Sequence, residues 1–388
     1  MISCVSEKMC IGCGGCHNKC PHQAITMKWD KKGFSYPVID EKKCTGCNLC
    51  EQVCPVLHPA APKKILKLIG GYYADKEIVS KSSSGGAFYL FASYIIANKG
   101  IVVGVVWNEE FLPVHKAIDN IDDLEAMHGS KYVQSDKRDI YACIEKYLKQ
   151  GKMVLFSGTP CECLAVKKYL GREYNNLYLL EFICHGIPSP IIWKEYLENL
   201  YNEKKIIPTE INFRSKERNG WHGYELKISH EEQNYYFPLR QDLFFNGFTE
   251  NLFLRESCYN CSCKCFKTAA DISVADFWGS EKYSPTLDDR NGKNGLSLVA
   301  CFSDKGINLL EKACNKGNFI YEILNSDKAY TSNSASMFQA TRNKNTDKFY
   351  KYRESKGTIE ALNKYARYTF KKKLCNKVIW KIRAFLEK

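Results

Sequence analysis

The sequence CIGCGGCHNKCP at residues 10–21 returns, with the same cysteine spacing, as CTGCNLCEQVCP at residues 44–55. Both copies follow the pattern C-x2-C-x2-C-x3-C-P, and they lie 34 residues apart. Three thiolates at such short intervals must wrap one corner of a metal–sulfur cube, and Gly12, Gly14, Gly15 and Gly46 leave the backbone free to do this. The repeat therefore indicates metal or redox chemistry in the first 60 residues.

The same spacing binds [4Fe–4S] clusters in bacterial ferredoxins, where the fourth cysteine of each run serves the other cluster. We expect one cluster on Cys10, Cys13, Cys16 and Cys54, and a second on Cys44, Cys47, Cys50 and Cys20. The alternative is one structural zinc ion per run, because zinc also takes four ligands. Two matching runs that each end in Cys-Pro favour iron–sulfur clusters, whose use is to move single electrons.

Composition places the chain among globular proteins. It has 388 residues, 45% of them hydrophobic, and 20 cysteines. That length allows about two domains, and that hydrophobic fraction excludes a disordered or collagenous chain. We expect a cytoplasmic protein, because no run of about 18 apolar residues occurs, the cysteine-rich start lacks a signal-peptide core, and reducing compartments suit clustered cysteines.

The positive charge is concentrated at the C-terminus. The net charge is +13, and residues 364–388 contribute +8 of it. The remaining chain is nearly balanced, which disfavours a zinc-stabilised nucleic-acid binder. Ile359, Leu362, Ala366 and Phe370 recur at mostly four-residue steps, so residues 358–386 are predicted to form a basic amphipathic helix. That helix could dock on the parent domain or a partner, or lie on the inner face of an anionic membrane.

Beyond residue 68 the pattern alternates between strands and helices, which is typical of an α/β unit. Strands are expected at 101–107, 153–156, 177–184 and 271–277. Helices are expected at 87–98 and 141–149, after the loop 157–161 to about residue 170, and after the loop 185–190 through Tyr196. Residues 224–230 and 233–239 are expected to pair as a hairpin, and residues 326–347 to be rich in loops. Cys161 and Cys184 follow consecutive strands, so we expect both at one edge of the sheet.

Eight motifs then occur in a recognisable order. They are SSSGG at 82–86, GSKYVQS at 129–135, GTPC at 158–161, CHG at 184–186 with PSP at 188–190, FRSK at 213–216, GW at 220–221, CYNC at 258–261 and DFWG at 276–279. This order resembles the coenzyme F420 hydrogenase/dehydrogenase beta-subunit family over about residues 70–310. Many bacterial members carry a fused two-cluster module, as this chain does.

The resemblance implies an iron–sulfur flavoprotein that usually holds FAD. Family members act on very different partners, and bacterial stand-alone forms often accompany polysaccharide-biosynthesis enzymes. We therefore expect an oxidoreductase that passes electrons from a ferredoxin-type donor through [4Fe–4S] clusters to FAD and a small organic acceptor. The alternative is a non-catalytic electron-transfer subunit that docks a separate hydrogenase or dehydrogenase.

The predicted fold is α+β, with three parts. Residues 1–60 would form a ferredoxin-like domain with two clusters, and residues 68–345 an α/β flavin domain with an added β-rich segment. Residues 346–388 would form the basic helical tail.

The resemblance also implies site residues. The turn expected to hold a flavin phosphate consists of Ser82, Ser83, Ser84, Gly85 and Gly86, although a plain helix cap explains that turn equally. The flavin or substrate pocket would be lined by Ser130, Lys131, Tyr132, Gln134 and Thr159. Arg214 and Lys216 could neutralise an anionic ligand.

A third [4Fe–4S] cluster is implied by four family-matching cysteines, which are Cys161, Cys184, Cys258 and Cys261. In the alternative, Cys161 and Cys184 are small core residues, and the extra Cys263 and Cys265 leave a local zinc site open. His185 could donate a proton to substrate or flavin, or could hydrogen-bond a turn carbonyl.

Overall fold

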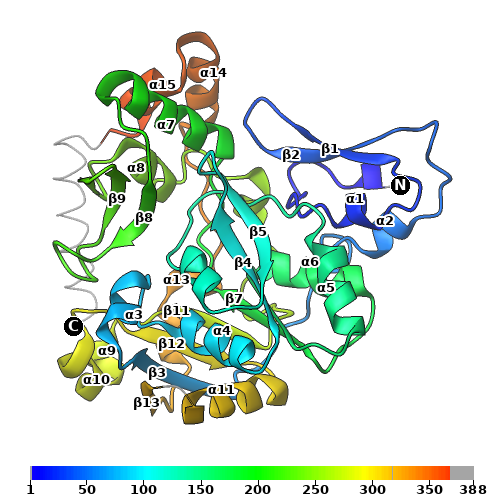
Figure 1. Cartoon of the computed structure of the whole chain (residues 1–388). Coiled ribbons are helices and arrows are strands. Elements are labelled where there is room, and N and C mark those ends of the chain that lie inside the picture. The colour runs from blue at the N-terminus through cyan, green and yellow to red at the C-terminus, as the bar shows by residue number, and fades with distance from the viewer. Residues whose placement is uncertain (1, 317, 368–388) are drawn as a thin grey trace.

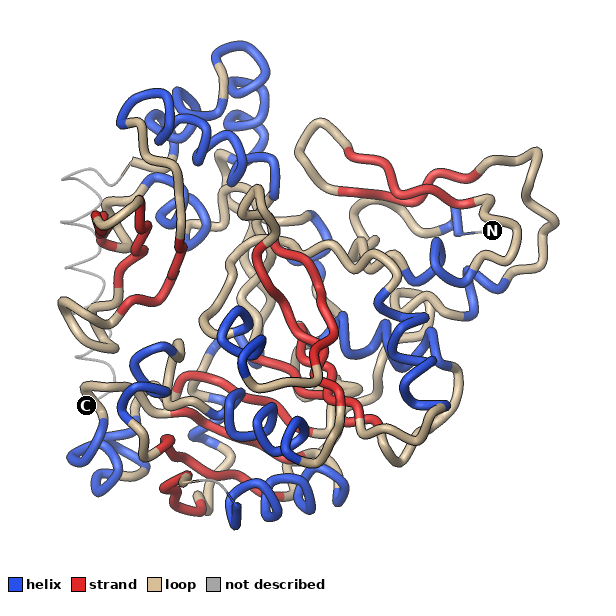
Figure 2. Tube along the Cα trace, viewed as in Figure 1, coloured by secondary structure: helices blue, strands red, loops and turns tan. Residues whose placement is uncertain are grey.

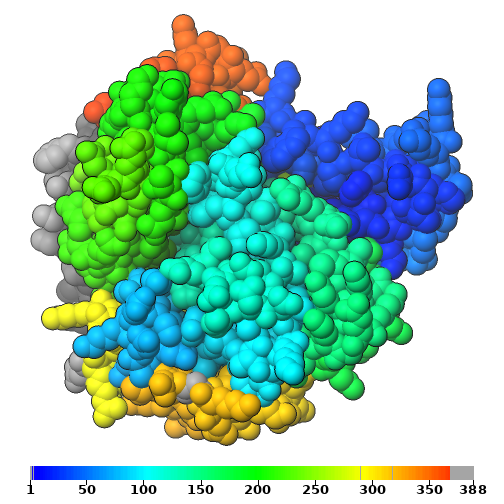
Figure 3. Space-filling model, in the orientation of Figure 1, coloured from blue at the N-terminus to red at the C-terminus, as the bar shows by residue number. Residues whose placement is uncertain are grey.

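The computed structural model describes residues 2–316 and 318–367. The N-terminal part forms its own lobe beside the rest of the molecule (Figures 1 and 3). Its elements are the 3-10 turn η1 (Ile2–Cys4), the helices α1 (Gly15–Lys19) and α2 (Leu49–Gln52), and the antiparallel strands β1 (Ile25–Trp29) and β2 (Ser35–Ile39).

One large mixed sheet forms the body, in the order β13-β3-β12-β11-β7-β6-β4-β5 (Figure 2). Its strands are β3 (Lys67–Tyr73), β4 (Ile101–Trp107), β5 (Pro113–Ile118), β6 (Val154–Gly158), β7 (Leu177–Phe182), β11 (Ile272–Asp276), β12 (Ser297–Cys301) and β13 (Phe319–Ile323). Strands β4, β6, β7 and β11 are parallel neighbours, and the other pairs are antiparallel.

Helices cover both faces of this sheet because successive strand residues point to opposite sides. Val102 and Leu155 pack with α4 (Ala87–Ala97) and α11 (Asp304–Lys316). Val103 and Phe156 pack on the other face with α5 (Ile140–Lys149) and α6 (Pro160–Leu170). The N-terminal lobe contacts α5 and α6 through α1.

A second, smaller sheet is antiparallel and has an aromatic core. It pairs β8 (Glu210–Ser215), β9 (Glu225–His230) and β10 (Gln233–Pro238). Trp193, Phe213 and Phe244 are fully buried against it, together with α7 (Pro190–Lys204), α8 (Leu243–Thr249), α14 (Thr346–Lys356) and α15 (Thr358–Tyr365). The remaining short elements are α3 (Lys76–Lys81), η2 (Asp122–Met127), η3 (Glu256–Asn260), α9 (Ser280–Tyr283), α10 (Pro285–Asn291), α12 (Lys328–Thr331) and α13 (Ser334–Met337).

Most predicted elements are confirmed. The helices expected at 87–98, at 141–149, and after the two loops are α4, α5, α6 and α7, and the expected hairpin is β9–β10. Helices α6 and α7 begin slightly earlier than expected, each at a proline inside the predicted loop. The loop-rich prediction for 326–347 is wrong in part, because α12, α13 and the start of α14 lie there.

The C-terminal helix also differs from the prediction. α15 ends at Tyr365, and the rest of the predicted helix over 358–386 lies outside the described residues from position 368. Leu362 and Ala366 are fully buried in the aromatic core, so this part of the predicted tail docks on the body. No helix within the described ranges is both long and apolar enough to cross a membrane.

Candidate functional site

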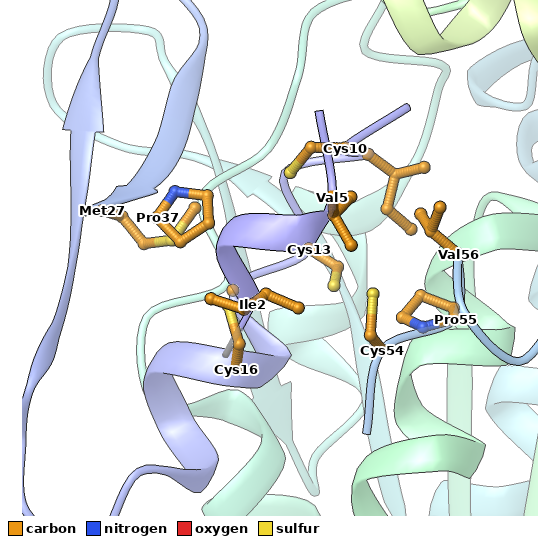
Figure 4. A pocket seen from close by; sticks show the side chains of 12 residues that line it. Ile2, Val5, Cys10, Cys13, Cys16, Met27, Pro37, Cys54, Pro55 and Val56 are labelled. Atoms are coloured by element: carbon orange, nitrogen blue, oxygen red, sulfur yellow. The ribbon is translucent and has the colours of Figure 1, made fainter. Parts of the chain in front are cut away.

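The first thiol pocket lies in the N-terminal lobe. Cys10 and Cys13 reach it from the loop before α1, Cys16 from α1, and Cys54 from the turn after α2 (Figure 4). Apolar side chains such as Val5 and Pro55 complete its wall. This is the crossed group of four cysteines that the repeat predicts.

The second pocket is lined by the other four cysteines of the repeat, Cys20, Cys44, Cys47 and Cys50. Backbone amides donate to sulfur in both pockets: Gly12 N lies 3.4 Å from Cys10 Sγ, and Ala24 N lies 3.3 Å from Cys20 Sγ. Within the described ranges, no three His, Cys, Asp or Glu side chains form a group that could hold a single metal ion. Four thiols around one space, with amides aimed at the sulfurs, fit a [4Fe–4S] cluster.

The two pockets differ in exposure. Cys13, Cys16 and Cys54 of the first pocket are buried, whereas Cys47 of the second is exposed. Burial, followed by the charges of neighbouring thiols, raises the pKa of Cys13 to about 12. This thiol is therefore neutral by itself, and metal coordination is what deprotonates it. The first pocket faces the body, and the second faces solvent.

A third set of cysteines gathers at the edge of the large sheet. Because β6 and β7 are parallel neighbours, Cys161 and Cys184 follow strand ends on the same side, as predicted. Burial raises the pKa of Cys161 well above its usual value, and the charges of Cys261 and Cys184 add to this. The charges of Cys258 and Cys261 act on Cys184 in the same way. The four family-matching cysteines thus lie near enough to one another for their charges to interact.

The two extra cysteines have different surroundings. Cys263 shares a hydrogen bond with Cys261, which lowers the pKa of Cys261 and raises that of Cys263. Cys265 is exposed, and its Sγ donates to the carbonyl of Met337 at 3.0 Å. Cys263 is therefore a neighbour of the third set, and Cys265 is turned to another partner.

The Ser/Gly turn before α4 meets the loop at 129–135. Ser83 Oγ lies 2.8 Å from both the hydroxyl and the backbone amide of Ser130. Arg214 donates to Ser83 O at 3.2 Å and to the Tyr132 hydroxyl at 3.1 Å. Asp276, the first residue of the DFWG motif, for which the sequence suggested no role, holds Arg214 through two hydrogen bonds of 2.7 and 3.0 Å.

Much of this turn is occupied by contacts within the protein. The hydroxyl of Ser297 accepts from the amides of Gly85 and Ala87 at 2.9 and 3.4 Å. Ser84 donates to Leu296 O, and Ser82 to Ile78 O. A Cβ at Gly85 would lie 2.6 Å from a backbone oxygen, so close strand packing alone explains that glycine.

Three other expected pocket residues have partners elsewhere. Gln134 donates to Ile11 O at 3.2 Å, in the loop of the first thiol pocket. Thr159 caps α6 and forms a capping box with Glu162, a signal that the sequence T-x-x-E already contains. Lys131 donates to His128 O at 3.0 Å, and burial lowers its pKa to about 7.

His185 lies beside the third cysteine set. Its Nε2 is 2.5 Å from Asn251 Oδ1, and its ring meets Phe248 edge-on. Lys264 donates to the carbonyl of the preceding Cys184 at 2.6 Å. The observed partner of His185 is therefore a side-chain amide, rather than the turn carbonyl considered above.

Buried polar residues connect the first pocket with the sheet edge, and no motif indicated them. The Tyr141 hydroxyl donates to Cys13 O at 2.7 Å. Lys137 pairs with Glu162, one residue after Cys161. Burial by itself would raise the pKa of Glu162, but the charges of Lys137 and His115 lower it to about 2. The carboxylate of Glu162 therefore stays ionised beside Cys161.

Two segments of the chain match known protein families. Residues 9–57 match a 4Fe-4S dicluster domain, and residues 151–326 match the family described as the C terminus of the coenzyme F420 hydrogenase/dehydrogenase beta subunit. The chain is 27% identical over 248 residues to the coenzyme F420-dependent sulfite reductase of Methanocaldococcus jannaschii. That match covers 62% of this chain and 38% of the relative, so the chain spans well under half of the relative's length.

A solved structure is also similar. The F420-reducing [NiFe] hydrogenase complex from Methanosarcina barkeri contains a chain that matches with a TM-score of 0.46 and 17% identity, over 67% of this chain and 83% of that one. The predicted order of motifs and the two sequence matches agree. The chain therefore contains one segment that matches a 4Fe-4S dicluster domain and a later one that matches the C terminus of the coenzyme F420 hydrogenase/dehydrogenase beta subunit.

Proposed function

We propose that this protein is an iron–sulfur flavoprotein oxidoreductase that takes electrons from a ferredoxin-type protein and delivers them to a small organic acceptor. The observation that most supports this proposal is that the chain has three groups of thiols. They lie in the exposed second pocket, in the buried first pocket and at the edge of the large sheet. When bound, the clusters supply single-electron transfer and FAD converts it to two-electron chemistry.

The chain's own residues set the order of the groups. Cys47 lies at the surface, where a partner protein can approach. Cys13 is buried, and Tyr141 fixes its loop to α5. At the sheet edge, Cys161, Cys184, Cys258 and Cys261 would hold the third cluster. His185, the residue that follows Cys184, would serve as the proton donor.

The flavin would lie along the contact between Ser83 and Ser130, where Tyr132 and Arg214 also meet. The stacked rings of Trp221 and Trp278, 4.3 Å apart, close one side of this network. We also propose that the turn binds a flavin phosphate. The amides of Gly85 and Ala87 already donate to Ser297, so a phosphate would have to be bound by other donors of the turn.

The acceptor class follows from the relatives. Both the family description and the name of the curated relative contain coenzyme F420, so a deazaflavin is our first candidate. A cytoplasmic location and a role beside polysaccharide-biosynthesis enzymes belong to the same proposal. We also propose that residues 1–60 and 68–345 are the functional units, with the second extending to at least Ala366 because that residue is buried in its core.

Anaerobic purification tests this function. We expect about twelve irons per chain for three clusters, one flavin, and reduction of F420 by a reduced ferredoxin. Cys161→Ser should remove about four irons. Cys163→Ser is the matched control, because Cys163 lies on the same helix and its Sγ donates to Leu180 O, a contact that serine can keep. Iron-replete protein that takes up no flavin after incubation with FAD would instead support the electron-transfer subunit.

A further inference from the structure

Arg255 is a buried cation between the N-terminal lobe and the body. Its side chain is 1% exposed, and it stands three residues before Cys258. Its Nε donates to Cys10 O at 2.8 Å, and its Nη2 lies 3.0 Å from Ser35 O and 3.8 Å from Cys10 Sγ. Its Nη1 donates to Gln134 Oε1 at 3.0 Å. The guanidinium is therefore fixed against the first thiol pocket.

Two residues of the N-terminal lobe allow the guanidinium of Arg255 to come close to the first pocket. The guanidinium lies over the ring of Tyr36, with 4.3 Å to the centroid. A Cβ at Gly12 would lie 2.6 Å from Nη1, so only glycine at this position lets the cluster-binding loop come so close. The loop that contains Gly12 and the hairpin that contains Tyr36 thus both contact the guanidinium.

The charge of Arg255 lacks an acidic partner in the described ranges of the chain. Two other arginines with little exposure each have a carboxylate: the buried Arg214 pairs with Asp276, and the partly buried Arg353 pairs with Glu195. The partners of Arg255 are two carbonyls, an amide oxygen and a thiol. An arginine stays protonated in proteins, and burying an uncompensated charge is costly. The negative charge that would compensate Arg255 has one evident source, which is a cluster bound by the thiolates of the first pocket.

We propose that Arg255 is the counter-cation of the cluster in the first pocket and raises its reduction potential. Reduction adds one electron from the donor and one unit of negative charge, and the guanidinium beside Cys10 stabilises that charge without moving a proton. The inference rests on the cluster assignment of the proposed function, but it does not depend on the flavin or on the acceptor.

An anaerobic redox titration of the full chain, followed by EPR, tests this role. Arg255→Met keeps a long side chain and removes the charge. It should lower the potential of the first cluster by at least about 59 mV, which is tenfold in a one-electron equilibrium, and shift the potential of the second cluster less. Arg255→Lys should shift the potential of the first cluster by a smaller amount. Arg353→Met is the matched control, because Arg353 also donates to the lobe, at Lys31 O, but is neutralised by Glu195.

A second variant covers the case in which Arg255→Met does not retain its iron. Gln134→Glu places a carboxylate at the position 3.0 Å from Nη1 and should lower the same potential without removing the arginine. Unchanged potentials in a variant with full iron content would overturn the inference, as would an equal shift in Arg353→Met. Absence of iron–sulfur signals from the wild-type chain would instead overturn the proposed function itself.

Discussion

His115 on β5 offers a quantitative test of the buried region between the first pocket and the sheet edge. Its ring lies parallel to that of Phe156, with centroids 5.3 Å apart. Among the described residues, neither ring nitrogen finds a hydrogen-bond partner. Burial lowers the pKa of His115 from 6.5 to about 4, and the charges of Glu162 and Lys137 add smaller effects of opposite sign. The ring is therefore neutral at pH 7.

The sign of the pH effect follows from this shift. Between pH 6.5 and pH 4 the unfolded chain binds a proton at His115 that the folded chain does not, so stability falls as the pH falls through that window. From pH 7 to pH 5 the loss is about 2 kcal/mol, and below pH 4 it reaches a limit of about 3 kcal/mol. His115→Phe removes both nitrogens and keeps a ring against Phe156. Its stability at pH 7 should equal or exceed that of the wild type by about 1 kcal/mol.

Urea unfolding of anaerobically prepared protein at pH 7 and pH 5 provides the assay. The free-energy difference between His115→Phe and the wild type should widen by about 2 kcal/mol at the lower pH. His58→Gln, a change at an exposed position, should follow the wild type at both values. A difference that stays constant between pH 7 and pH 5 would show that His115 is not held neutral by burial, and the reasoning would fail.

Three further predictions address the sites. Cys20→Ala should abolish the EPR signal of the second cluster and Cys54→Ala that of the first; the opposite pattern would contradict the crossed ligand sets. Asp276→Asn should destabilise the body by about 3–5 kcal/mol in urea, because Arg214 is left buried without its carboxylate, and a loss under 1 kcal/mol would argue against this. Gly86→Ala should cost about 1–2 kcal/mol, because φ is 87° there, and an unchanged unfolding midpoint would refute the strain.

The sequence predicts those parts of the site that depend on local spacing. Eight cysteines in two runs match the spacing of bacterial ferredoxins, and this pattern predicts which thiols share a pocket. The alternation of strands and helices likewise predicts that Cys161 and Cys184 share a sheet edge, since parallel strands end on the same side. The positions of Cys258 and Cys261 beside them follow from family resemblance alone.

Residues whose partners are distant in sequence could not be assigned in this way. Gln134 belongs to a family motif that indicated the flavin pocket, yet its amide contacts Ile11, more than a hundred residues earlier. Arg255 lies in no motif, and only the docked lobe shows its environment. The regular apolar steps of the tail predicted a helix correctly up to Tyr365. They did not show that Leu362 would be buried against α7 and α8.

The exposure of the two N-terminal pockets also bears on the direction of electron flow. Burial alone makes the first cluster harder to reduce than the exposed second one, because reduction adds negative charge in a poorly solvated place. Arg255 opposes this effect by placing a permanent positive charge 3.8 Å from Cys10 Sγ. If the first cluster has the higher potential in the wild type and loses that rank in Arg255→Met, then the guanidinium outweighs burial. Electrons that enter near Cys47 then pass to the first cluster because the side chain of Arg255 raises the reduction potential of that cluster.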